Sequence, residues 1–252
     1  MYDAADVGRS AISQSVYHII MTLIRKNTSL AAVILQEPSV IPVVNRFGIC
    51  LGVNNATVGQ ICAAHDLDCD FVLAILNTVV NESYFPENLL RSCGCHEVVC
   101  YLSKADRDCR STLMPNVRAH FARLMSTVAG DSNMPVIHEM ARKALAALDS
   151  AIERELAGVF PVVMHGGNAG VYDMVAQHTG VMRDCWSEIA DLRSMLVNLV
   201  SGTMDANLLY AVIVAVGALE TDLHKNNRLR SRILLPLLND EVSAAPADSS
   251  MA

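Results

Sequence analysis

The sequence has few aromatic residues, and this scarcity limits the folds it can adopt. Phe, Trp and Tyr make up 5% of its 252 residues, with a single Trp. The AVILMFWYC group still accounts for 52% of the chain, so the apolar bulk comes from Ala, Leu, Val, Ile and 12 Met. Aliphatic residues of this kind favour packed helices over an aromatic-rich β-sandwich. A chain of this length forms one large domain or two small ones.

Positive charge is also scarce. The chain has 19 Lys and Arg against 26 Asp and Glu, which gives a net charge of -7. No segment forms a basic stripe, so we expect no nucleic-acid partner. Helices over residues 58–65 and 69–80 would resemble a helix-turn-helix. The second of them begins with Cys69, Asp70 and Phe71 instead of the Arg, Lys or Asn that reads DNA, so a packing hairpin is expected.

Signals for secretion and membrane insertion are missing. The first ten residues, MYDAADVGRS, carry two aspartates where a secretory signal has basic residues. The longest uncharged apolar run, Leu208–Leu219, is shorter than the ~20 residues that span a bilayer. We therefore expect a cytoplasmic protein with no membrane partner. In that reducing compartment the eight cysteines are expected to be small buried residues or metal ligands, and not a disulfide framework.

Nucleotide-binding and hydrolase motifs such as G-x-x-x-x-G-K-[ST] and G-x-S-x-G do not occur. The segment Cys93-Gly94-Cys95-His96, followed by Cys100, has atoms that suit zinc or iron, with His96 and Cys100 on one helical face. Its C-x-C-H-x-x-x-C spacing is not a structural zinc pattern. A cysteine-rich surface turn is the alternative, and the two interpretations stay open.

Helical periodicity divides the chain into four parts. Residues 1–27 contain an amphipathic helix over 9–25. Residues 28–86 form a small domain of short helices, and residues 87–238 form a bundle of longer ones. The polar composition of residues 239–252 is typical of a disordered tail.

Four antiparallel helices with short connections predict an up-down-up-down order. Pro115 is expected to kink the first helix. Thr57, Asp68 and Asp205 are predicted helix N-caps. The predicted long helices cover residues 96–129, 135 to just before 158, 171–200 and 205–227, and a short helix over 230–238 follows. The predicted fold class is therefore all-α, with a small N-terminal helical domain followed by a four-helix bundle.

Polar residues lie on or beside the apolar stripes of three different bundle helices. They are Glu155, His178 and His224, and Glu220 lies one turn before His224. A bundle core can hold a metal when several helices each supply a His or a carboxylate. A hydrogen-bonded core residue is the more common role of a single such His, so both interpretations stay open.

Two parts of the chain are similar to the hemerythrin-like iron–sulfur cluster repair proteins. Residues 45–77 resemble the N-terminal domain of that family, on Arg46-Phe47-Gly48-Ile49, Leu51-Gly52, Thr57-Val58, Ile61-Cys62, Asp68, Phe71 and Asn77. The second half resembles the family's bundle, on Val159-Phe160-Pro161, Glu220-Thr221-Asp222-Leu223-His224 and Ile233-Leu234-Leu235-Pro236. Together the resemblance covers most of residues 28–238.

The resemblance implies two irons bridged by carboxylates, and a role in repairing iron–sulfur centres damaged by nitric oxide or oxidants. Several residues that the family would supply are replaced here. The cysteine pair expected after Gly48-Ile49 is absent, and residues 105–111 of the first bundle helix contain no His. Ala151 stands where a His is expected one turn before Glu155.

The family pattern leaves a reduced set of metal donors. The predicted ligands are His178, His224, Glu155 and Glu220, with Asp106 and Cys109 as further donors. Arg228 stands at a carboxylate position one turn after His224. A guanidinium stays protonated and cannot donate a lone pair to iron. We therefore expect a degenerate member of the family, with either no cofactor or iron in a remnant non-haem site.

These expectations favour a non-catalytic scaffold or regulator in the nitric oxide and oxidative stress response. Its expected partners are a second copy of the chain, or an iron–sulfur or regulatory protein. The alternatives are an iron-binding repair protein with a reduced ligand set, and a sensor that binds haem or another ligand through His178. Whether the protein is an enzyme stays open.

Overall fold

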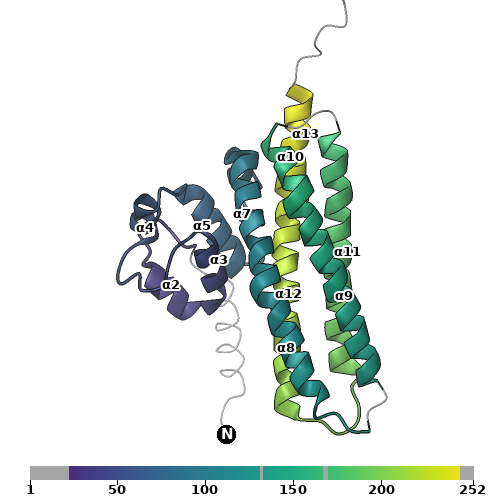
Figure 1. Cartoon of the computed structure of the whole chain (residues 1–252). Coiled ribbons are helices and arrows are strands. Elements are labelled where there is room, and N and C mark those ends of the chain that lie inside the picture. Colours follow the sequence, from purple (N-terminus) through teal and green to yellow (C-terminus); the bar gives the residue numbers. More distant parts are fainter. Residues whose placement is uncertain (1–22, 131–132, 167–169, 245–252) are drawn as a thin grey trace, which may run out of the picture. The chain divides into compact units, whose positions relative to one another are not determined.

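The structure, a computed structural model, describes residues 23–130, 133–166 and 170–244 (Figure 1). Every element in these residues is a helix, and their only β-type pairings are two isolated bridges, Ser29 with Thr57 and Ala129 with Thr203. The predicted all-α class is confirmed. The chain divides into two compact units, Met1–Leu89 and Leu90–Ala252.

The N-terminal unit contains short helices whose starts are fixed by side-chain caps. Thr57 and Gln60 form a reciprocal capping box, and Asp68 accepts hydrogen bonds from the backbone N–H groups of Asp70 and Phe71. These caps confirm the predicted helix starts. The elements are α2 (Leu30–Gln36), the 3-10 turn η1 (Pro38–Val40), α3 (Ile41–Arg46), α4 (Val58–Ala64) and α5 (Cys69–Val80), and α6 (Glu87–Ser92) crosses into the second unit.

A buried asparagine ties the start of the described chain to α5. The Asn77 side chain accepts a hydrogen bond from Ile24 N at 2.7 Å and donates to Ile24 O at 3.0 Å and Leu73 O at 2.8 Å. This clamp holds residues 23–25 in an irregular conformation, so the predicted helix over 9–25 does not include them. The rest of that prediction, residues 9–22, lies outside the described residues.

Four long helical segments build the C-terminal unit. Three of them contain a π-turn, a short stretch of i→i+5 hydrogen bonds. The segments are α7 (Gly94–Asp108) with η2 (Cys109–Leu113) and α8 (Met114–Met125); α9 (Met134–Arg154) with η3 (Glu155–Val159) and α10 (Phe160–Met164); α11 (Val171–Asn198); and α12 (Ala206–Leu229) with η4 (Arg230–Leu234) and α13 (Leu235–Ala244). Asp205 caps α12, as predicted.

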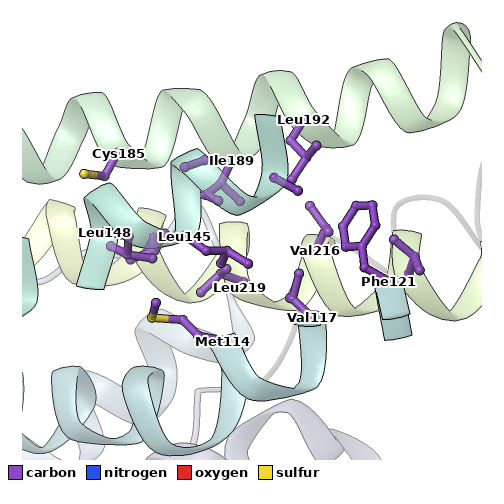
Figure 2. Packing of buried hydrophobic residues seen from close by; sticks show 14 of the residues in the cluster. Met114, Val117, Phe121, Leu145, Leu148, Cys185, Ile189, Leu192, Val216 and Leu219 are labelled. Carbon is purple, nitrogen blue, oxygen red and sulfur yellow. The ribbon is translucent and has the colours of Figure 1, made fainter. Parts of the chain in front are cut away.

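The four segments lie side by side around an aliphatic core. Consecutive segments run in opposite directions in Figure 1, and α11 packs against both α9 and α12 while α8 packs against α12 and α9. Figure 2 shows part of this core, in which Leu148, Ile189 and Leu219 belong to one cluster of buried side chains between the helices. Phe121 is the only Phe, Trp or Tyr among the buried residues of this cluster, which agrees with the low aromatic content.

Prolines explain the three π-turns. A proline inside a helix lacks the N–H donor, and its ring clashes with the carbonyl four residues earlier. Each π-turn is followed by a helix with proline at its second position. The i→i+5 hydrogen bond that closes the turn keeps the helix continuous. The prolines are Pro115, Pro161 and Pro236, and the closing bonds join Met114 N to Cys109 O, Phe160 N to Glu155 O and Leu235 N to Arg230 O.

These continuous helices correct several predicted boundaries. The first segment continues past Pro115, as the predicted helix over 96–129 does, although it ends at Met125; the second does not end before Gly158 but continues to Met164. The predicted short helix over 230–238 is the continuation of α12, and it extends to Ala244. Residues 239–244 are therefore helical and not part of an irregular tail, while residues 245–252 lie outside the described part.

One continuous helical stretch in the described residues, Ala206–Asp240, is long and apolar enough by length and composition to cross a membrane. Core helices of soluble proteins pass the same test, and 22% of the apolar window of this stretch is buried. The cytoplasmic localisation and the absence of a membrane partner stay predictions.

Candidate functional site

Four polar side chains meet inside the C-terminal unit, one from each helical segment. They are Asp106 from α7, Glu155 from η3, His178 from α11 and Arg230 from η4, and we call them the polar cluster. Their side chains are 3%, 2%, 8% and 0% exposed, respectively. Burying charges at this depth costs free energy unless each charge is paired and hydrogen-bonded.

The guanidinium of Arg230 is the centre of the polar cluster. Its Nε donates to Glu155 Oε1 at 2.9 Å, and its Nη2 donates to Glu155 Oε2 at 2.8 Å, which makes the pair bidentate. The same Nη2 donates to Asp106 Oδ1 at 2.6 Å. Nη1 donates to Asn227 Oδ1 at 3.4 Å. One cation therefore joins three of the four segments.

Two buried polar atoms of the cluster have no hydrogen-bond partner among the described residues. They are Asp106 Oδ2 and His178 Nε2. His178 Nε2 lies 3.6 Å from Glu155 Oε2, which is longer than a normal hydrogen bond. The imidazole thus faces the carboxylate without a direct bond.

The electrostatics of the two carboxyl groups differ. Burial raises the pKa of Asp106 well above its ordinary value, and nearby Glu155 adds to this while Arg230 opposes it. Burial would also raise the pKa of Glu155, but the charge of Arg230 and the neighbouring His178, Arg230 and Asp106 groups lower it to about 2. Burial would lower the pKa of Arg230, whereas Asp106 and Glu155 raise it above its ordinary value. The ion pair with Arg230 thus favours the charged form of Glu155, whereas burial favours the protonated form of Asp106.

The π-turns and the polar cluster coincide along the helices. Glu155 and Arg230 are each the first residue of a π-turn, six residues before Pro161 and Pro236. Asp106 lies three residues before η2. π-turns occur frequently at functional sites, because they change the direction in which side chains leave the helix. This coincidence marks the cluster as the candidate site.

Only two of the four predicted metal ligands belong to the polar cluster. Glu155 and His178 are brought together, as described above. His224 is half-buried, and its ring centroid lies 5.1 Å from that of Trp186. Glu220 forms an ion pair with Arg193, with Nε 2.6 Å from Oε2. The structure therefore does not place His224 and Glu220 with the other two.

The sequence interpretation placed Arg228 in the remnant metal site, but in the structure Arg230 lies there, against Glu155 and Asp106. Arg228 is half-buried, whereas Arg230 is fully buried against both carboxylates. The sequence contains a signal for Arg230, because it follows the buried Val216 and Leu223 at intervals of seven residues. Seven residues are about two helical turns, so all three share one face.

The donor set does not fit the di-iron centre that the resemblance implies. Arg230 already engages Glu155 and Asp106, and His224 and Glu220 lie elsewhere. A guanidinium donates hydrogen bonds but no lone pair, so it cannot be a metal ligand. Within the described residues, no group of three or more His, Cys, Asp or Glu is arranged to hold a metal.

In the cysteine-rich segment at the start of α7, the structure confirms that His96 and Cys100 lie on the same helical face. Cys100 Sγ lies 3.9 Å from both ring nitrogens of His96. His96 Nδ1 also lies 3.7 Å from Glu97 Oε1. Both open interpretations of Cys93, Cys95 and their neighbours stay predictions.

No protein-family profile matches the chain, and no curated protein matches it significantly. The resemblance to the iron–sulfur cluster repair proteins therefore depends only on the short residue matches within residues 45–77 and in the second half of the chain. Membership in that family is a proposal.

Proposed function

We propose that this protein is a non-catalytic scaffold or regulator built on a hemerythrin-like up-down-up-down four-helix bundle, in which an internal ion pair has replaced the di-iron centre. It is related to the iron–sulfur cluster repair proteins and acts in the nitric oxide and oxidative stress response. The observation that carries this proposal is the guanidinium of Arg230, bonded to Glu155 and Asp106 in the interior of the C-terminal unit.

A metal centre in a helical bundle has two roles. It supplies chemistry, and it holds the helices together through charged ligands. Arg230 fulfils the second role, because it connects α7, η3 and η4 through charge-assisted hydrogen bonds. It does not fulfil the first role, because a guanidinium cannot change its oxidation state or accept a ligand. The architecture is thus kept without iron chemistry.

A scaffold acts through its surface, and α12 exposes apolar side chains that support this. Tyr210 and Val214 lie one turn apart on α12 and are 69% and 51% exposed, and Val197 near the end of α11 is 63% exposed. Exposed apolar groups of this size mark sites of protein association when they cluster. The expected partner is a second copy of the chain, or an iron–sulfur or regulatory protein.

The test is the iron content of the full chain purified without oxygen and then incubated with ferrous iron. We expect far less than one iron per chain after removal of loosely bound metal, and no absorption from oxo-bridged iron. Two irons per chain would overturn the proposal, and one would favour an iron-binding repair protein with a reduced ligand set. Addition of haem tests the sensor alternative, because binding through His178 would shift the Soret band.

A further inference from the structure

We propose that Arg230 is a resident cation that keeps divalent metal ions out of the polar cluster, and that a small neutral side chain at this position opens a mononuclear metal site formed by Asp106, Glu155 and His178. This inference rests on the proposed function, which takes the wild-type protein to be metal-free at this centre. It adds what now excludes the metal and which donors remain.

The first argument is the position of Arg230 Nη2. This atom lies 2.6 Å from Asp106 Oδ1 and 2.8 Å from Glu155 Oε2. One point inside the protein is therefore close to carboxylate oxygens from two helical segments. Metal–oxygen distances are about 2.0–2.6 Å, so small movements of the two side chains would bring both oxygens to an ion at that point.

The second argument comes from atoms that Arg230 does not bind. His178 Nε2 and Asp106 Oδ2 are buried without a hydrogen-bond partner among the described residues. His178 Nε2 lies 3.6 Å from Glu155 Oε2. Two donors that each lie about 2.1 Å from one metal, at a near-tetrahedral angle, are about 3.4 Å apart. The imidazole and the carboxylate are thus close to the separation of neighbouring ligands.

Charge gives the third argument. Without the guanidinium, Asp106 and Glu155 would be two buried carboxyl groups with no cation nearby, which is strongly unfavourable for their charged forms. A dication at the same place would restore the balance. Conversely, a dication in the wild-type cluster would lie within a few ångströms of a fixed positive charge. This repulsion weakens its binding by at least about a hundredfold.

The donor atoms indicate the class of metal. Two carboxylate groups and one imidazole suit first-row divalent ions such as Co²⁺, Fe²⁺ and Zn²⁺, with water in the remaining positions. The space left by the arginine side chain would accommodate that water. Co²⁺ is the useful probe, because its visible absorption reports the number and geometry of its ligands.

The experiment compares Co²⁺ binding by the full chain and its Arg230→Ala variant, with stoichiometry from elemental analysis and geometry from the visible spectrum. We expect one Co²⁺ per chain in R230A, bound at least about a hundredfold more tightly than in the wild type. Arg230→Lys is the matched control, because it keeps a cation on a long side chain, and it should bind no better than the wild type. The double variant R230A/E155Q should lose the site.

Two results would overturn the inference. One is Co²⁺ binding by R230A that is no tighter than by R230K, and the other is tight binding that persists in R230A/E155Q. Should R230A fail to fold, Arg230→His decides instead, because its imidazole fills part of the space and adds a donor. If neither variant folds or binds in millimolar Co²⁺, the inference is wrong. Iron in the wild-type protein would overturn the proposed function, whereas variants that take up no metal would overturn this inference alone.

Discussion

The guanidinium of Arg230 and the carboxylate of Glu155 form a bidentate ion pair in the interior of the protein, with Nε 2.9 Å from Oε1 and Nη2 2.8 Å from Oε2. The two residues are 75 positions apart in the sequence. Each begins a π-turn, and the pair joins the second helical segment to the fourth. The stability and the pH dependence of the C-terminal unit should therefore depend on this pair.

Replacing Arg230 by Met should destabilise the protein strongly. Met fills a similar volume but leaves the Glu155 charge buried without its partner, and breaking a buried pair in this way costs about 3–5 kcal/mol of unfolding free energy. Denaturant titration at neutral pH measures this loss. The exposed Arg107, next to Asp106, gives the control Arg107→Met, which should change stability by less than about 0.5 kcal/mol. Equal effects of the two variants would show that the pair does not stabilise the fold.

The two carboxyl groups of the cluster should respond differently to neutralisation. The folded pKa of Glu155 is about 2, below its unfolded value of about 4.3. Its contribution is therefore present above about pH 4.3 and is lost as the pH falls towards about 2. Glu155→Gln should cost about 3 kcal/mol at neutral pH and almost nothing near pH 2. Glu153→Gln, which removes a charge two residues away on the surface, should cost less than about 1 kcal/mol.

The contribution of Asp106 to stability should depend on pH in the opposite direction to that of Glu155. Because its folded pKa is raised, its contribution to stability is fully present below the unfolded value of about 3.9 and is lost as the pH rises through the folded value. Asp106→Asn keeps a neutral group that can still accept from Arg230. It should match or exceed the wild type at neutral pH, and its advantage should shrink as the pH falls towards about 4. Denaturant titrations from pH 3 to 8 test this, and a loss as large as that of E155Q would show that Asp106 is ionised.

The helices of this protein could be predicted from the sequence because their signals are local. Thr57, Asp68 and Asp205 each bond to backbone groups within three residues, so a short stretch of sequence is enough to recognise the cap. The exceptions were the continuations past Pro161 and Pro236. A proline normally ends a helix, and nothing local distinguishes an end from a π-turn that carries the helix onward.

The candidate site was predicted only in part because its contacts are distant in sequence. Glu155 and His178 were found through their place on apolar stripes, but Arg230 bonds to residues 75 and 124 positions away. Whether a carboxylate faces a metal or an arginine depends on which face of the continuous helix of α12 and η4 holds Arg228 and which holds Arg230. Arg228 and Arg230 are two residues apart, which is about 200° around a helix, so they lie on nearly opposite faces. A small error in the predicted register therefore selects the wrong arginine.

The clamp between Asn77 and Ile24 should control the local stability of the N-terminal unit. Asn77→Ala removes the partners of both Ile24 backbone groups, and leaving such groups unsatisfied costs about 2–3 kcal/mol. We expect faster amide hydrogen exchange at residues 23–28 than in the wild type. The neighbouring Thr78→Val is the control, because within the described residues the Thr78 hydroxyl donates to Ala74 O of the same helix. An unchanged exchange rate in N77A would show that the clamp does not hold this segment.

Two helical glycines should respond in opposite directions to replacement by Ala. At Gly180, within α11, a Cβ atom would meet nothing within 4 Å, whereas at Gly59, within α4, it would lie 3.0 Å from Lys26 O. Gly180→Ala lowers the entropy of the unfolded chain without a clash, so it should stabilise the protein by about 0.5–1 kcal/mol. Gly59→Ala gains the same entropy but must push the Lys26 backbone away, and Gly59 N also donates to Lys26 O at 2.8 Å. It should destabilise the N-terminal unit by about 1 kcal/mol or more. Denaturant titration of both variants measures the difference, and a gain in stability in G59A would show that residues 26–28 move aside easily.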